Sequence, residues 1–136
     1  MTERTVGFTN GCFDILHIGH LKLLSHLKHK CDIVIAAIDS DSRVRQLKGS
    51  ARPFNSQDDR KYMLQSLRYV DMVYIFDSEQ ALEQIIKNHN PDLMIVGSEY
   101  KERRVVGSQY AKKLEFFEKI DGYSTTKILQ NRSDWR

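Results

Sequence analysis

Short, wholly apolar runs alternate along this chain with longer stretches in which apolar residues recur every three or four positions. The run Ile33 to Ile38 (IVIAAI) has no polar residue, as expected of a strand covered on both faces of a parallel sheet. Residues 5–9, 72–76, 93–96 and 114–117 are interpreted as four further strands. Helical stripes lie between the runs: Leu21, Leu24 and Leu27; Met63, Leu64 and Leu67; and Leu82, Ile85 and Ile86. The alternation predicts an α/β fold, a single open parallel sheet of about five strands with helices on both faces.

Length and composition narrow the class of protein. The 136 residues suffice for one compact domain and are too few for two, so residues 1–130 are expected to form the domain and residues 131–136 a C-terminal tail. A net charge of +3 suits an anionic small substrate but falls short of a nucleic-acid-binding stripe. No leader peptide is evident, no apolar run spans a membrane, and two cysteines make a poor disulfide framework. We expect a soluble cytoplasmic protein without nucleic-acid or membrane partners.

The ends of the expected strands carry the residues of interest. In an open parallel sheet, ligands bind beyond the carboxyl ends of the strands, where the strand order reverses. Polar and small residues follow three of the expected strands, in the segments Asn10 to Asp14, Asp39 to Asp41, and Gly97 to Tyr100. The chemistry is therefore expected at this edge of the sheet.

Two histidines flank a glycine where the first loop enters the leucine-striped helix, in the sequence His17-Ile18-Gly19-His20. Residues three apart at the start of a helix share a face, so both imidazoles can reach one ligand. Gly19 lets a phosphate approach the backbone, and the helix N-terminus adds unpaired N–H donors. We interpret this turn as a triphosphate site. Ordinary surface histidines are one alternative, and a zinc site with Cys12 is a weaker one, because structural zinc takes four ligands.

Two further groups are expected to face an anion. Arg60 begins the apolar stripe of its helix, so its guanidinium should point toward the sheet edge; the alternative is a pairing with Asp58 or another acid. The hydroxyl cluster Ser124 to Thr126 could cradle phosphate oxygens, or one of its hydroxyls could merely cap a helix.

The segment Gly11 to His20 resembles the signature of the cytidylyltransferase-like nucleotidyltransferases, whose hallmark is a His-x-Gly-His turn. The resemblance runs from about Val6 to Leu129 and includes Leu47-Lys48-Gly49, Arg52-Pro53, Asp59-Arg60-Lys61, Val70-Asp71, Pro91-Asp92-Leu93, Gly97-Ser98-Glu99-Tyr100 and Gly122-Tyr123-Ser124-Thr125-Thr126. It implies a Rossmann-like sheet and an enzyme that transfers a nucleoside monophosphate from a nucleoside triphosphate to a phosphorylated acceptor, releasing pyrophosphate. Mg²⁺ carried by the triphosphate is the expected cofactor, with no dedicated metal site in the protein. Relatives are commonly dimers, so a homodimer is expected.

The resemblance also implies roles for individual residues. His17 and His20 contact the triphosphate and stabilise the pentacoordinate transition state, and Lys48 and Arg60 complete the expected catalytic set. The expected nucleotide-binding residues are Cys12, Phe13, His17, Gly19, His20, Gly97, Ser124, Thr125 and Thr126. The expected acceptor-binding residues are Asp14, Lys22, Asp39 and Asp41. Alternatives are a solvated lysine for Lys48, a turn cap for Asp14, and loop structure for Asp39 and Asp41.

Two branches of the family compete for the substrates. Three segments look like the adenylyltransferase domain of bifunctional ADP-heptose synthases, which implies ATP and a heptose 1-phosphate: 47–53, 97–100 and 105–108. Segments 67–71 and 124–128 equally resemble glycerol-3-phosphate cytidylyltransferase, which uses CTP, but Lys119 replaces an arginine of that group. We favour the sugar-phosphate branch, as a transferase without the accompanying sugar kinase domain. A catalytically silent nucleotide-binding module is a third interpretation.

Overall fold

The computed structural model describes residues 3–118. Its strands are Val6–Gly11 (β1), Ile33–Asp39 (β2), Met72–Phe76 (β3), Leu93–Gly97 (β4) and Leu114–Phe117 (β5). Its α-helices are Ile18–Lys30 (α1), Asp41–Lys48 (α2), Gln57–Gln65 (α3) and Glu79–His89 (α4), and short 3₁₀ turns cover Ser98–Tyr100 and Ser108–Tyr110. The expected boundary between domain and tail at residue 130 lies outside the described residues and stays a prediction.

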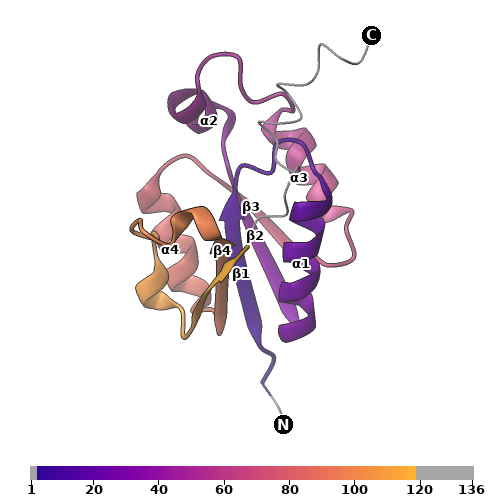
Figure 1. Ribbon diagram of the computed structural model, residues 1–136, viewed down its shortest axis with the longest axis vertical. Helices are drawn as coiled ribbons and strands as arrows, with labels where there is room; N and C mark the ends of the chain where they lie inside the picture. Colours follow the sequence, from indigo (N-terminus) through magenta and orange to yellow (C-terminus); the bar gives the residue numbers. More distant parts are fainter. Residues whose placement is uncertain (1–2, 119–136) are drawn as a thin grey trace.

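The five strands form one parallel sheet in the order β3-β2-β1-β4-β5, which confirms the predicted fold class. The chain runs outward from β1 to β3 and then returns to the other side of β1 with β4. The strand order therefore reverses between β1 and β4, the place where ligands bind in sheets of this type. In Figure 1 the carboxyl ends of the strands point toward α2, opposite the N-terminus of the chain.

Helices cover both faces of the sheet, with α1 and α3 on one face and α4 on the other (Figure 1). Successive residues of a strand point to opposite faces, and β2 supplies both hydrophobic clusters in turn. Val34 and Ala36 pack with α1 and α3, whereas Ile35 and Ala37 pack with α4. This two-sided burial is the physical reason why β2 contains an unbroken apolar run.

Helix α2 is the element that the apolar pattern does not predict. Val44 is its one buried residue, so it presents no stripe, and its start is instead defined by Ser40, whose side chain accepts a hydrogen bond from the N–H of Arg43. Asp41 is consequently the first residue of a helix rather than part of a loop. Leu67, expected in the stripe of α3, lies beyond the end of that helix at Gln65. Within residues 3–118 no helix combines the length and apolarity needed to cross a bilayer.

Candidate active site

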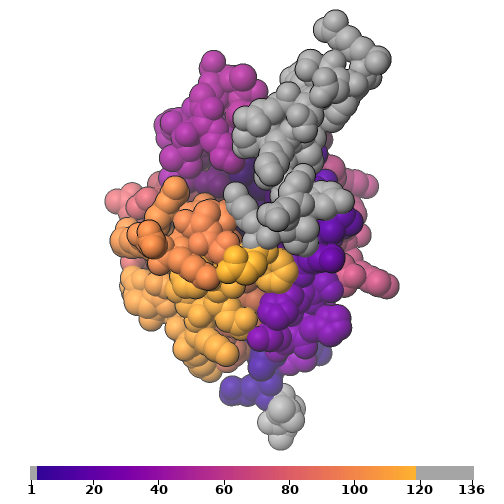
Figure 2. Space-filling model, viewed as in Figure 1, coloured from indigo at the N-terminus to yellow at the C-terminus, as the bar shows by residue number. Residues whose placement is uncertain are grey.

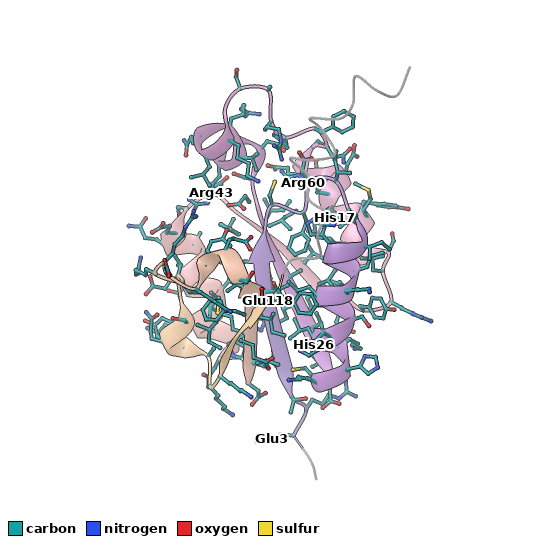
Figure 3. All side chains as sticks on the ribbon, in the orientation of Figure 1. Glu3, His17, His26, Arg43, Arg60 and Glu118 are labelled. Atoms are coloured by element: carbon teal, nitrogen blue, oxygen red, sulfur yellow. The ribbon has the colours of Figure 1, made fainter. Side chains whose placement is uncertain are left out.

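The expected site residues that the structure describes gather mainly at one end of the molecule. His17 and Arg60 lie near α2, the helix that carries Arg43, and Glu3 marks the opposite end (Figure 3). In the space-filling view, α2 and the loop after it form the upper end of the described surface (Figure 2). The loop from β1 to α1, residues 12–17, and the ends of β2 and β4 meet there, as the strand order requires.

His17 and His20 form a reciprocal cap at the start of α1. Nδ1 of His17 accepts a hydrogen bond from the N–H of Gly19 at 3.0 Å, and Nδ1 of His20 accepts one from the N–H of His17 at 3.3 Å. The two rings stack with their centroids 3.9 Å apart. Because a ring nitrogen that accepts carries no proton, each neutral imidazole must hold its proton on Nε2. The cap thus fixes two Nε2–H donors side by side at a helix N-terminus.

His20 stays neutral at physiological pH. Burial, together with electrostatic interactions with His17 and Lys48, lowers the pKa of His20 from 6.5 to about 3. The ring therefore keeps an N–H for hydrogen bonding without carrying a charge. Such a group stabilises negative charge by donating from a fixed position, and it does not act as a general acid near pH 7.

Acidification is expected to destabilise the fold through His20. The unfolded chain protonates this ring near pH 6.5 and the folded chain only near pH 3, so between these values the unfolded state binds more protons. Stability then rises with pH and is lost as pH falls, by about 1 kcal/mol between pH 6 and pH 5 from this group alone. Urea unfolding of the wild type and of His20→Gln at pH 6 and pH 5 measures this loss of stability. Equal pH dependence in the two proteins would contradict this reasoning.

Lys48 and Cys12 lie within electrostatic reach of this pair. Lys48 is the exposed last residue of α2, and its charge lowers the pKa values of both His20 and Cys12. The pKa of Cys12 is nevertheless raised, because burial of its thiol outweighs the lysine. Lys48 therefore faces the same loop as the histidines, and its positive charge is available to an anion there.

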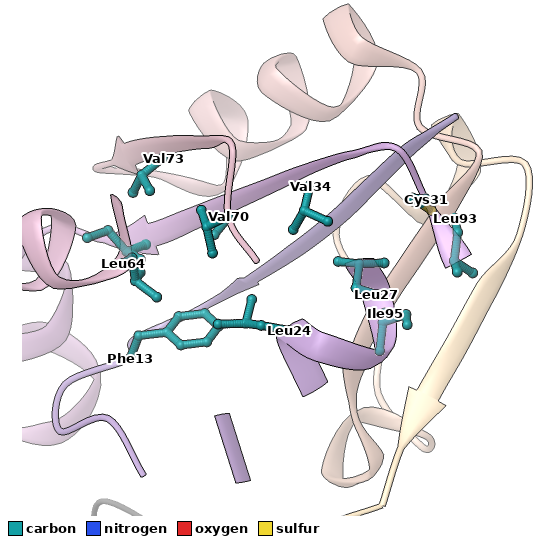
Figure 4. Close-up of a cluster of buried hydrophobic side chains, with 12 residues drawn as sticks. Phe13, Leu24, Leu27, Cys31, Val34, Leu64, Val70, Val73, Leu93 and Ile95 are labelled. Atoms are coloured by element: carbon teal, nitrogen blue, oxygen red, sulfur yellow. The ribbon is translucent and has the colours of Figure 1, made fainter. Parts of the chain in front are cut away.

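Phe13 is placed in the core rather than at an open surface. Its ring is 5% exposed and joins the cluster that contains Leu24 and Leu64 (Figure 4), and its centroid lies 5.0 Å from that of His20. Its φ of 51° is in the left-handed region, where a non-glycine residue is strained. The Phe13 ring packs against His20 from the core side. Because this ring is buried, Phe13 could contact a nucleotide only through its backbone.

Asp14 clamps the loop between α2 and α3. Its fully buried carboxylate accepts the N–H groups of Phe54 at 2.7 Å and Asn55 at 2.8 Å, and Nε of Arg52 at 3.3 Å. The amide of Asn55 donates in return to the carbonyl oxygen of Asp14 at 2.7 Å. Asp14 therefore neither caps its own turn nor offers an unused carboxylate to an acceptor.

Arg60 joins four segments of the site from inside the protein. Its side chain has no exposed surface, and it donates to the carbonyl oxygens of Asn55 (3.0 Å), Cys12 (3.0 Å) and Asp39 (2.7 Å) and to Oδ1 of Asp41 (2.8 Å). The alternative considered for Arg60, a pairing with an acid, is thus present, with Asp41 in place of Asp58. Four of its five N–H groups are thus used, and the guanidinium has no exposed surface with which to contact a triphosphate.

The two other expected acceptor carboxylates are also engaged. Oδ1 of Asp39 accepts Nε of Arg43 at 2.7 Å, and Arg43 in turn lies over the ring of Phe76. Asp41 exchanges hydrogen bonds with Gln57, which ties the start of α2 to the start of α3. Lys22, the remaining acceptor candidate, is exposed on α1. These contacts build the frame of the site and leave cations, rather than carboxylates, as its available groups.

The end of β4 adds a residue that the expected set lacks. Gly97 ends this strand, and a side chain there would collide with the carboxylate of Glu99. Tyr100 follows, and its pKa is raised mainly by burial and further by the charges of Glu99 and Asp39. Tyr100 lies three residues after the end of β4, within the segment 97–100 that the sequence places at this edge of the sheet.

Some predicted site residues lie outside the described residues, and some residues of the site were not predicted. Ser124, Thr125 and Thr126 lie outside the described residues, so their roles stay predictions. Sequence reasoning did not select Asn55 or Arg43. Asn55 bonds to Asp14 across 41 positions, which no local motif encodes, whereas Arg43 pairs with Asp39 at the i,i+4 spacing, a local signal that was available. Across residues 3–118, no cluster of three or more His, Cys, Asp or Glu is arranged to hold a metal ion.

A doubly wound parallel sheet with paired histidine donors at the helix after its central strand defines a nucleotidyltransferase-type α/β domain. The family model described as cytidylyltransferase-like matches residues 8–131. The chain belongs to this cytidylyltransferase-like family, which confirms the resemblance. It is 44% identical over 132 residues to the bifunctional protein HldE of Campylobacter concisus, covering 97% of this chain and 28% of that protein. It is 45% identical over 127 residues to HldE of a Nitratiruptor species, covering 93% and 27%.

Solved structures agree on the fold. The lipopolysaccharide core biosynthesis protein of Thermoplasma volcanium GSS1 superposes with a TM-score of 0.71 at 23% identity, over 88% of this chain and 100% of that one. Pantoate-beta-alanine ligase from Francisella tularensis gives a TM-score of 0.62 at 15% identity, over 87% and 60%. The chain spans little more than a quarter of the length of the HldE proteins it matches.

Proposed function

We propose that this chain transfers a nucleoside monophosphate from a nucleoside triphosphate to a phosphorylated sugar, with ATP and a heptose 1-phosphate as the substrate pair. The observation that carries the proposal is the pair of Nε2–H donors that the reciprocal cap fixes at the start of α1. The identity of about 44% to HldE proteins favours the sugar-phosphate branch over a polyol phosphate.

The reaction is an in-line displacement at the α-phosphorus. A phosphate oxygen of the acceptor forms the new P–O bond, and pyrophosphate leaves with the electron pair of the bond that breaks. The acceptor oxygen is already ionised at neutral pH, so the protein needs no nucleophile of its own. His17 and His20 donate to oxygens whose negative charge grows in the transition state, and Lys48 adds a positive charge beside them.

Mg²⁺ enters this proposal as part of the substrate, bound to the triphosphate. The carboxylates near the site are taken by arginines, Asp39 by Arg43 and Asp41 by Arg60, so they fit a frame better than a cage for a resident cation. Arg60 is proposed to position Cys12 and Asp39 rather than to touch the triphosphate, because four of its five N–H groups donate within the protein and its side chain has no exposed surface. A cytoplasmic homodimer stays an expectation.

Pyrophosphate release with matched substrate panels tests the function. Purified protein is incubated with Mg²⁺, ATP or CTP, and one acceptor at a time: heptose 1-phosphate, glucose 1-phosphate or glycerol 3-phosphate. We expect release with ATP and heptose 1-phosphate, and ³¹P NMR should show the new diphosphate. Preference for CTP and glycerol 3-phosphate would move the assignment to the cytidylyltransferase branch. Tight triphosphate binding without release from any pair would favour a silent nucleotide-binding module.

A further inference from the structure

Among residues 3–118, two buried side-chain polar atoms have no hydrogen-bond partner: Oδ1 of Asn10 and Nη2 of Arg52. Asn10 is the last residue but one of β1, and Arg52 lies in the loop between α2 and α3, so both belong to the carboxyl end of the sheet. Buried polar groups in folded proteins nearly always have partners, because an orphaned donor destabilises the folded state. An orphan beside a substrate site is explained when the substrate supplies the missing acceptor.

The guanidinium of Arg52 is bonded within the protein through its Nε atom. Its Nε donates to Oδ2 of Asp14 at 3.3 Å, and its backbone N–H donates to the carbonyl oxygen of Gly49 at 3.2 Å, which closes the turn before it. The carboxylate of Asp14 also accepts hydrogen bonds from two backbone N–H groups, so its oxygens are shared between these groups and the arginine. The side chain is 13% exposed, and its Nη2 remains unused.

The last residue of α2 and the loop after it bring two cations to the loop between β1 and α1. Lys48, four residues earlier, acts electrostatically on His20 and Cys12. Arg52 lies against Asp14, which is two residues after Cys12 and three before His17. A triphosphate and an acceptor phosphate each need positive donors, and this arrangement places one cation for each.

Arg52 also has a more suitable charge for binding the acceptor phosphate than the acceptor-binding residues expected from the sequence. A phosphate dianion is bound by cations and N–H donors, whereas three of the four expected residues are carboxylates: Asp14, Asp39 and Asp41. Each of these is already bonded within the protein. A planar guanidinium with a spare terminal donor suits a phosphate better than a lysine does, because it can offer two parallel N–H groups.

We propose that Arg52 binds the phosphate group of the acceptor, an inference that rests on the proposed function and assigns the acceptor half of the same site. Asp14 orients the guanidinium through Nε, and the terminal nitrogens donate to the phosphate that attacks the triphosphate. Arg52 forms no covalent bond and transfers no proton. It holds the acceptor oxygens while His17, His20 and Lys48 hold those of the donor.

Steady-state kinetics of Arg52→Gln test this assignment. With the substrate pair that the wild type uses, KM for the acceptor is expected to rise about 10- to 100-fold, as for loss of a charge-assisted hydrogen bond. KM for the triphosphate and kcat should change little. Arg52→Lys should recover part of the loss, and Arg45→Gln, an exposed arginine of α2, should behave as wild type. An unchanged acceptor KM in Arg52→Gln overturns the proposal.

A binding measurement separates this proposal from the enzymatic one. Inorganic phosphate is titrated by calorimetry into the full chain, saturated with a non-hydrolysable ATP analogue, for the wild type, Arg52→Gln and Arg45→Gln. We expect at least roughly tenfold weaker phosphate binding for Arg52→Gln alone. Equal binding by all three proteins, or none by the wild type, overturns the role of Arg52. Arg52-dependent binding without pyrophosphate release from any pair upholds the anion site and rejects the proposed catalysis.

The stability of Arg52→Gln distinguishes binding from support of the loop. Thermal unfolding of the three proteins is followed without ligand. A midpoint close to that of the wild type, with weaker phosphate binding, supports direct contact. A large drop in the midpoint, with equal losses for triphosphate and phosphate, assigns Arg52 to the frame of the site instead.

Discussion

His20→Ala is expected to lower kcat about 10²- to 10³-fold, the effect of removing one preorganised donor from a transition state. The reason lies in the reciprocal cap: Nδ1 of His20 is occupied by the N–H of His17, so its proton sits on Nε2. Burial keeps this ring neutral, so the alanine variant loses a fixed donor and not a charge. Most of the loss should appear in kcat rather than in KM for the triphosphate, because the donor acts on charge that develops during the reaction.

Two control variants separate the loss of the Nε2–H donor in His20→Ala from the loss of fold stability that the same substitution causes. The alanine also removes the N3 half of the reciprocal cap and leaves the N–H of His17 without its acceptor, which is expected to cost about 1 kcal/mol of stability, so rates are compared below the unfolding transition. His20→Gln restores an amide N–H and should regain part of the rate. His29→Ala alters an exposed histidine in the last turn of the same helix and should leave kcat unchanged. Wild-type turnover by His20→Ala would remove the basis of the proposed mechanism.

The local part of the site was readable from the sequence because it follows from spacing. His17 and His20 are three residues apart at a helix start, and the cap that joins them uses only backbone and side chains of one turn. The strands were equally readable, since residues 34–38 of β2 are buried and all apolar. The fold class is confirmed, and the prediction that the site lies at this edge of the sheet rests on the same kind of local pattern.

Most of the frame of the site was not readable, since most of its bonds join residues far apart in sequence. The carboxylate of Asp14 meets the N–H groups of Phe54 and Asn55 across 40 and 41 positions, and Arg60 reaches the carbonyl of Cys12 across 48. Nothing near Asp14 in the sequence indicates these partners. The apolar stripe placed the buried face of Arg60 correctly but left its partner open, and the partner proved to be Asp41.

Arg60→Met is expected to destabilise the protein by about 3–5 kcal/mol, because it breaks an ion pair whose cation is fully buried and also leaves buried backbone acceptors unpaired. The methionine leaves the carboxylate of Asp41 without its cation and strips the donor from three carbonyl oxygens, those of Cys12, Asp39 and Asn55. Urea unfolding measures the loss. Arg45→Met, on the exposed side of α2, should stay within about 0.5 kcal/mol of the wild type. Equal stability of the two variants would show that the buried guanidinium does not hold the frame.

Two further variants, Asp41→Asn and Arg60→Lys, show whether Arg60 positions neighbouring residues or contacts the substrate itself. Asp41→Asn keeps an oxygen acceptor but removes the charge, so we expect a smaller loss than in Arg60→Met, and the two changes should not add, because they break one shared contact. Arg60→Lys keeps the charge but lacks the planar fork that serves several acceptors at once. If Arg60 positions the ends of β1 and β2, its folded lysine variant should bind the triphosphate nearly as tightly as wild type and lose mainly kcat. Loss of triphosphate affinity at unchanged stability would instead assign the guanidinium to the ligand, and the bonds it makes to Cys12 and Asp39 would then have to open during the reaction cycle.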